Sequence, residues 1–345
     1  MIDLTDRVAE WRASVEAGRD AREADASLAA LRESDRCCEA VLHVRGCTKL
    51  SSRHLSTLAR ALPRQLRALT LELGGCHGLE SLDGLFDGLA SLMALETLAL
   101  GLEGCSGLAH VGGPTGRCWP LRGLSLKLCN CTGLVSIEEF AWGLAQLPRM
   151  TALSLDFRGC ASLTSVDELG RGLAHLGALT TLTLDFEGCK GLLSMDELGR
   201  GLAHLKDLTA LTLALTNCQG LVNIYELGES MAALPALSTL FLSHDALRGR
   251  GTAHEARTFR SVAEFLEAHR TAVAAAVAAA TASEIVEGVQ EPHPRSPGGS
   301  TAGATTGVPD WTPAASTPTL DSATSFGEVE APELPELPEL PELPP

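Results

Sequence analysis

Apolar and polar residues alternate in short segments that recur along the chain. In each segment, apolar side chains stand seven, five and three positions before a cysteine, as Leu182, Leu184 and Phe186 do before Cys189. Alternation with a period of two predicts a β-strand with one buried face. The same positions are apolar before six cysteines: Cys76, Cys105, Cys131, Cys160, Cys189 and Cys218. The pattern therefore predicts a series of equivalent strands.

Between these strands the apolar spacing changes to that of a helix. Val166, Leu169, Leu173 and Leu176 are separated by three, four and three positions, which places them on one helical face. A serine or asparagine followed three residues later by a glutamate matches the capping box, in which each side chain accepts a backbone N–H. Such pairs stand at Ser136/Glu139, Ser165/Glu168, Ser194/Glu197 and Asn223/Glu226. Each unit is predicted to be a strand, a turn and a helix.

Seven cysteines set the length of the unit. Cys47 and the six cysteines above are separated by 29, 29, 26, 29, 29 and 29 residues. A fixed period in this range is typical of a solenoid of stacked units. The pattern L-x-x-L-x-L-x-F-x-x-C-x-x-L, from Leu179 to Leu192, resembles the leucine-rich repeat family. The unit length and the helical half resemble its ribonuclease-inhibitor-like subclass, with cysteine at the usual Asn/Cys position.

The resemblance implies a definite architecture for about residues 40–247. It implies an α/β fold: a right-handed, horseshoe-shaped solenoid with a parallel sheet on the concave face and helices on the convex face. One unit departs from the period, because residues 110–123, HVGGPTGRCWPLRG, replace the helical half between Cys105 and Cys131. This stretch is predicted to be an irregular loop on the convex face. A degraded eighth unit follows, in which Leu240 and Leu242 hold the phase.

Four segments are expected, in chain order: an N-terminal capping helix at 1–39, the solenoid at 40–250, a C-terminal helix at 251–289 and a disordered, acidic, Pro-rich tail at 290–345. The first helix carries an apolar stripe that includes Trp11, and a cap is needed because an end unit would otherwise expose its core. The tail ends in PELPELPELPELPP, whose three-residue period favours polyproline II. A linear docking motif in this tail remains open beside a solvated spacer.

Composition narrows the class of protein. The net charge is −16 and there is no basic stripe, which argues against nucleic-acid binding. No apolar stretch has the character of a membrane helix, and the first twelve residues carry charges where a secretory signal is apolar. The expected location is therefore the cytoplasm, with the nucleus as an alternative. The cysteines are predicted to be reduced thiols, and they lack the spacing of a metal site. The seven repeat cysteines are predicted to be buried at tight turns, whereas Cys37 or Cys118 should react faster with thiol reagents.

The residues that alternate with the buried leucines are predicted to point outward from the concave sheet. Among them, one patch on three adjacent units carries charges of both signs. We predict this patch to be the partner-binding site, formed by Lys127, Asp156, Arg158, Asp185 and Glu187. The concave positions hold few of the Trp, Tyr and Arg residues that dominate binding energy, so a weak to moderate, salt-sensitive complex is expected.

No catalytic constellation or phosphate-binding loop stands out in the sequence. The predicted function is a non-enzymatic, monomeric scaffold or adaptor that needs no cofactor and binds a protein partner. One alternative is a GTPase activator, which would need an exposed arginine beside the sheet edge; Arg117 is the only loose candidate. Another is a ubiquitin-ligase substrate-recognition subunit, but residues 4–34 are short and polar for an adaptor-binding helical box.

Overall fold

The computed structural model describes residues 2–18, 38–114, 119–221 and 224–244, together with isolated positions between and beyond these ranges. All of them belong to a compact unit that spans Met1–Val289. The predicted helix at 251–289, apart from four single positions, and the predicted tail at 290–345 lie outside the described residues. So do Cys37, Arg117 and Cys118, whose predicted properties remain predictions.

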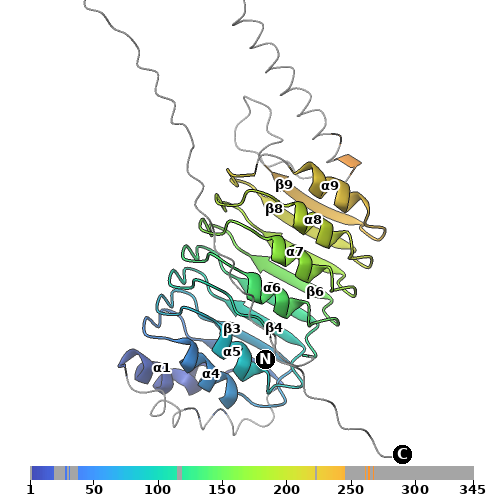
Figure 1. Ribbon diagram of the computed structural model, residues 1–345. Coiled ribbons are helices and arrows are strands. Elements are labelled where there is room, and N and C mark those ends of the chain that lie inside the picture. Colours follow the sequence, from blue (N-terminus) through green and yellow to red (C-terminus); the bar gives the residue numbers. More distant parts are fainter. Residues whose placement is uncertain are drawn as a thin grey trace, which may run out of the picture. The chain divides into compact units, whose positions relative to one another are not determined.

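All the strands of the described chain form one parallel sheet in chain order (Figure 1). Their bounds are β1 (Ile2–Asp3), β2 (Glu39–His43), β3 (Ala68–Glu72), β4 (Thr97–Gly101), β5 (Gly123–Lys127), β6 (Ala152–Asp156), β7 (Thr181–Asp185), β8 (Ala210–Leu215) and β9 (Thr239–His244). Strands β3 to β8 are those predicted before the six cysteines, and β9 is the predicted degraded unit.

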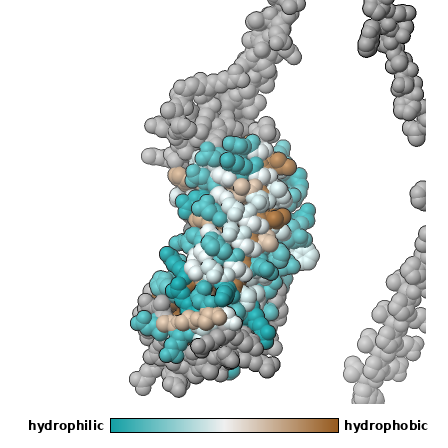
Figure 2. Space-filling model, turned by 90° about the vertical axis from the view of Figure 1, so that its left-hand side faces the viewer, coloured by the Kyte–Doolittle hydropathy of each residue, from teal (hydrophilic) through white to brown (hydrophobic). Residues whose placement is uncertain are grey.

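Helices α4 to α9 cover one face of this sheet, and η1 and α1 lie at its N-terminal end (Figure 1). Their bounds are η1 (Thr5–Val8), α1 (Ala9–Glu16), α4 (Ser52–Ala61), α5 (Asp83–Leu89), α6 (Glu138–Leu144), α7 (Asp167–Leu173), α8 (Asp196–Leu202) and α9 (Tyr225–Ala232). Strand and helix alternate from β2 onward except between β4 and β5, where no helix forms among the described residues. This arrangement confirms the predicted right-handed α/β solenoid. We call the sheet surface away from these helices the concave face. On the side that Figure 2 presents, hydrophilic and neutral residues predominate, and apolar ones gather only in small patches.

Equivalent residues of neighbouring units lie side by side across the sheet. Leu155 of β6 pairs with Leu184 of β7, which pairs in turn with Leu213 of β8. The same register holds across the short unit, where Leu100 of β4 pairs with Leu126 of β5. The loss of three residues therefore leaves the strands aligned.

The seven repeat cysteines, Cys47, Cys76, Cys105, Cys131, Cys160, Cys189 and Cys218, lie in the core, and we call them the cysteine ladder. The seven repeat cysteines are buried, and all are free thiols. Each thiol from the second unit onward donates a hydrogen bond to a backbone carbonyl of the preceding unit, as Cys160 Sγ does to Leu128 O at 3.1 Å and Cys189 Sγ to Phe157 O at 3.1 Å. This confirms the predicted role of a small buried residue that bonds to loop backbone.

The residue before each cysteine adopts a left-handed backbone conformation. It is a glycine in five units, as at Gly188 with φ of 75°, and an asparagine in the other two, at Asn130 and Asn217 with φ of 59°. Glycine tolerates this region because it lacks a Cβ, and asparagine enters it more readily than other residues. The turn that ends each strand therefore depends on this position.

The predicted capping boxes of α6, α7 and α8 are wrong in their geometry. The N-cap of α7 is Val166, and Ser165 Oγ accepts the N–H of Asp167 at 3.1 Å rather than that of the third helical residue. The carboxylate of Glu168 does not reach back, because it pairs with Arg171 one turn later. Ser136 and Ser194 accept N–H groups in the same way. Asn223 lies outside the described residues.

A capping box does form at α4, where the sequence pattern had not indicated one. Ser51 is the N-cap, and its backbone N–H donates to His54 Nδ1 at 3.2 Å. The His54 ring here takes the place that a glutamate has in the usual motif.

The N-terminal segment differs from the single helix expected across 4–34. Strand β1 joins the edge of the sheet by pairing with β2. Helix α1 ends at Glu16, close to Gly18, whose φ is 73°. The apolar stripe is buried as expected, and Trp11 is fully covered.

Candidate functional site

The sheet register brings the predicted patch together on the concave face. Lys127 of β5 pairs with Asp156 of β6, which pairs with Asp185 of β7. Neighbouring strands are about 4.8 Å apart, so these three side chains form one row. Arg158 and Glu187 follow two positions after Asp156 and Asp185, in the next row.

Arg158 is the centre of this patch. Its Nη2 donates to Asp156 Oδ2 at 2.7 Å, and its Nε donates to Asp156 Oδ1 at 3.0 Å. The same Nε lies 3.5 Å from Asp185 Oδ2, so one guanidinium bridges two strands. The side chain of Arg158 is 50% exposed, whereas that of Asp156 is only 16% exposed. The arginine thus covers the carboxylates and presents its outer edge to solvent.

The two carboxyls differ in their acidity. Burial raises the pKa of Asp156, but hydrogen bonds from Arg158 and from the Cys129 thiol outweigh it and hold the pKa below its usual range. Burial also raises the pKa of Asp185, and the negative charge of Asp156 adds to this rise. The two carboxylates compete for one guanidinium, and Asp156 holds the shorter contacts.

Cys129 is a further member of the patch that sequence reasoning did not assign to it. Its Sγ accepts from Arg158 Nη2 at 3.6 Å, on the side away from Asp185. Partial burial and the neighbouring Asp156 raise the pKa of this thiol to about 11, so it stays protonated at neutral pH. The signal in the sequence was its place directly after Leu128, at the outward position that corresponds to Arg158 in the next unit.

Lys127 and Glu187, the other two residues of the predicted site, lie outside the Arg158 bridge. Both are exposed. The backbone N–H of Glu187 donates to Asp185 Oδ1 at 3.0 Å, which orders the end of β7. Among the described residues, neither side chain forms an ion pair within 4.0 Å. These two side chains carry the charges of the patch that are free for a partner.

A second ion pair lies on the concave face towards its N-terminal end. Arg45 Nη2 donates to Glu72 Oε2 at 2.7 Å, and Glu72 raises the pKa of Arg45. The carboxylate of Glu72 lies over Gly101, where a Cβ would overlap it. The small residue at 101 therefore makes room for the neighbouring glutamate, a role that its place in the outward column did not reveal.

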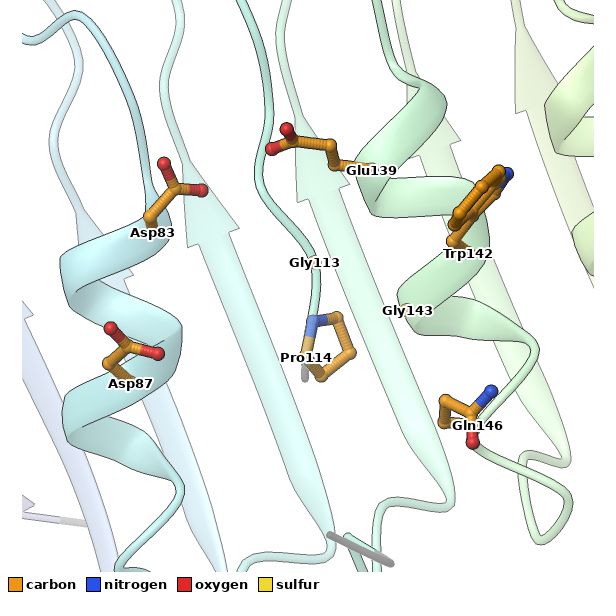
Figure 3. Close-up of a pocket in the computed structure, with 8 residues that line it drawn as sticks. All are labelled: Asp83, Asp87, Gly113, Pro114, Glu139, Trp142, Gly143 and Gln146. Atoms are coloured by element: carbon orange, nitrogen blue, oxygen red, sulfur yellow. The ribbon is translucent and has the colours of Figure 1, made fainter. Parts of the chain in front are cut away.

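The convex side carries a cavity at the short unit. Between α5 and α6 no helix forms in the described part of residues 110–123, and Gly113 and Pro114 run alongside α6 instead (Figure 3). This confirms the predicted irregular loop. The cavity has a volume of about 580 Å³. Its lining consists of Asp83, Asp87, Gly113, Pro114, Glu139, Trp142, Gly143 and Gln146.

Two further findings bear on what these surfaces hold. Within the described residues, no group of three or more His, Cys, Asp and Glu side chains is placed to bind a metal ion. None of the helices in the same part of the chain combines the length and the apolar character that crossing a membrane requires.

The repeated strand, turn and helix with one register and one cysteine ladder decide the architecture. The fold is a leucine-rich-repeat solenoid. No protein-family model matches the chain, and no curated protein matches it either.

The solved structures that are similar to the chain include two leucine-rich-repeat proteins. One is human 5T4 (Wnt-activated inhibitory factor 1, trophoblast glycoprotein), with 19% identity over 57% of this chain and 75% of that chain, at a TM-score of 0.33. The other is the leucine-rich repeat-containing protein LegL7 from Legionella pneumophila, with 18% identity over 70% of this chain and 81% of that chain, at a TM-score of 0.29. Because both TM-scores lie below 0.5, neither structure bears on the function of this chain.

Proposed function

We propose that this chain is a non-catalytic scaffold that binds a protein partner through its concave face, around Lys127, Asp156, Arg158, Asp185 and Glu187. The observation that carries the proposal is the bridge from Arg158 to Asp156 and Asp185. It holds three charged groups of adjacent units in one arrangement before any partner arrives. A preorganised polar surface loses less conformational freedom on binding than a mobile one.

The distribution of free charge supports a particular mode of recognition. Asp156 neutralises Arg158 within the patch, while Lys127 and Glu187 stand exposed on either side of the pair. Partly exposed ion pairs contribute little to stability. A partner with a carboxylate opposite Lys127 and a cation opposite Glu187 would therefore be oriented by the two free charges. Such complementarity sets register and association rate more than affinity.

The experiment compares affinity capture by the wild-type chain with capture by Lys127→Glu and Glu187→Lys variants. Both reversals act on exposed side chains, so the free energy of unfolding should stay within about 0.5 kcal/mol of wild type. Partners retained by the wild type should be lost from both variants and kept by a chain that lacks residues 332–345. Loss on removing the tail, with full retention by both variants, would instead assign binding to the docking motif of the tail.

Reversal of Asp156 is less suitable for this experiment. It would leave Arg158 without its closest partner and place a second positive charge beside it. A loss of binding in that variant would mix recognition with local rearrangement.

The proposal extends to the remaining properties expected from the sequence. We assign the chain to the ribonuclease-inhibitor-like subclass, and we propose a cytoplasmic or nuclear monomer that binds neither nucleic acid nor membrane and needs no cofactor. The acidic net charge of −16 supports the exclusion of nucleic acid. Sedimentation equilibrium at two protein concentrations tests the monomer, which a concentration-dependent mass would contradict.

A further inference from the structure

The helices on the convex side share one sequence pattern that changes beside the short unit. Helices α7 and α8 both read DELGRGL, and the glutamate at the second position pairs with the arginine at the fifth. These pairs are Glu168 with Arg171 and Glu197 with Arg200. Opposite charges three residues apart on a helix neutralise each other at the surface.

The helices that flank the cavity lack this arginine. In α6 the fifth position is Trp142, and in α5 it is Asp87. No lysine or arginine among the described residues forms an ion pair with Asp83, Asp87 or Glu139. Three carboxylates therefore line one cavity without a cation from this part of the chain, whereas the glutamates that correspond to Glu139 in the next two units are neutralised.

The cavity floor is built so that the side chains of the described residues do not fill it. Gly113 and Gly143 are buried against each other, and a Cβ on either would overlap backbone atoms of the other segment. Pro114 adds an apolar surface between the two helices (Figure 3). A volume of about 580 Å³ falls in the range of pockets that bury a ligand, roughly 300–1,000 Å³.

The carboxylates converge on this space from both sides. In Figure 3, Asp83 and Asp87 extend from α5, and Glu139 extends from α6 towards them. Asp83 Oδ2 accepts from Ser81 Oγ at 2.5 Å, which orients that carboxylate. Trp142 stands on the outer side of α6, where its Nε1 donates to Glu168 Oε2 at 3.1 Å. Its ring is held in place and is still 63% exposed.

We propose that this cavity, the helix gap, binds an arginine-bearing segment of a protein partner. The planar guanidinium donates through several N–H groups and can bridge two carboxylates, which suits a site with acids on both walls. The methylene groups of an arginine pack on an apolar surface such as Pro114. A neighbouring residue of the same segment would cross α6 and rest on the exposed ring of Trp142, where cations and apolar groups both bind well.

The probe is a fluorescein-labelled peptide in which alanine alternates with arginine, and the readout is fluorescence anisotropy at physiological salt. Neutralising Asp87→Asn or Glu139→Gln should weaken binding by about three- to tenfold each, since each removes one charge-assisted contact. Trp142→Arg, which restores the pattern of α7 and α8, should weaken it at least as much. The same peptide with citrulline in place of arginine should bind far more weakly, because citrulline is uncharged.

A matched control separates the helix gap from general attraction to an acidic protein. Glu197→Gln changes the net charge by the same amount at the helical position that corresponds to Glu139, and it should leave peptide affinity unchanged within about twofold. Equal weakening in Asp87→Asn, Glu139→Gln and Glu197→Gln would overturn the proposal, as would equal binding of the citrulline peptide.

Two further outcomes also decide against the proposed occupant. Binding that appears only in an Arg117→Ala variant would show that the chain's own arginine competes for the gap. Undiminished binding in Asp87→Asn and Glu139→Gln, combined with loss in Glu187→Lys, would place the peptide on the concave face. The concave proposal and the helix-gap proposal thus fail independently.

Discussion

The regular units at α7 and α8 and the short unit between α5 and α6 close the helix side of the same sheet in different ways. In the regular units the helices approach so closely that a Cβ on Gly201 would overlap the carbonyl oxygen of Gly170. In the short unit an extended Gly-Gly-Pro segment lies where the helix would be, and a cavity remains beside it. Yet the strands β4 and β5 keep the register of all the others. A solenoid thus absorbs a deletion on its helix side, where neighbours interact through side chains and local backbone, and not in its hydrogen-bonded sheet.

The largest expected effect tests whether the strands are packed equally tightly in the regular units and beside the short unit. Leu184 lies in a regular unit and Leu126 in β5, which directly follows the shortened segment, and each is about fully buried. Leu184→Asp and Leu126→Asp would both place an unpaired carboxylate in the core, at a cost on the order of 4 kcal/mol or more. Urea unfolding followed by circular dichroism measures the change. A mild effect of Leu126→Asp alone would mean that the short unit is loosely packed down to its strands.

The second prediction uses the cysteine ladder. Burial raises the pKa of Cys131, which closes the short unit, and of Cys160, in a regular unit, to about 12 in each case. An unfolded thiol has a pKa of about 8.5. The folded pKa is the higher one, so this stabilisation is complete below pH ~8.5 and is lost as the pH rises towards 12.

The stability of the wild type should therefore fall steeply in alkali. Cys131→Ala and Cys160→Ala should each remove about 2 kcal/mol from the difference in unfolding free energy between pH 8 and pH 10, because one pKa unit corresponds to about 1.4 kcal/mol. Urea unfolding at the two pH values, with reductant present, gives the difference. Identical pH dependence in wild type and both variants would contradict the burial of these thiols.

The third prediction addresses the close approach of the helices. Gly201→Ala should destabilise by about 2 kcal/mol, because the added methyl meets backbone atoms that cannot turn aside. Gly113→Ala in the short unit meets the carbonyl oxygen of Glu139 and should cost less, since an extended segment beside a cavity can shift. Gly177→Ala is the matched control, with no atom within 4 Å of the added Cβ. A larger fall of the thermal unfolding midpoint in Gly113→Ala than in Gly201→Ala would contradict this expectation.

The smallest expected effect comes from making the short unit resemble its neighbours. Trp142→Arg places an arginine three residues after Glu139, which should contribute about 0.3–0.5 kcal/mol as an ion pair on one helix. The hydrogen bond from the indole to Glu168 is lost in exchange. The net change in unfolding free energy should therefore stay below about 0.5 kcal/mol, and chemical denaturation in replicate measures it. A larger loss would show that Trp142 is a structural residue and not an exposed surface of the helix gap.

Particular elements show where sequence reasoning succeeded and where it could not. The alternation of leucines predicted β3 to β8 in their correct places, because a period of two allows only one face to be buried. The capping boxes failed at α6, α7 and α8, because each serine accepts the N–H two residues later instead of three. At α7 and α8 the glutamates pair with arginines of their own helix. Strand β1 was missed, since two residues carry no periodic signal and form a strand only by pairing with β2.

The sequence alone determined the repeat, its strands, the buried thiols and the row of charges from Lys127 to Asp185. These follow from local periodicity, and a constant period repeats each side chain at the same place in every unit. Only the tertiary structure decided that Arg158 joins Asp156 and Asp185, that Cys129 lies against Arg158, and that three carboxylates without an ion pair among the described residues line the helix gap. The contacts between units join residues that are distant in the chain, and they depend on the distance between neighbouring units. That distance is set by packing, which no single unit encodes.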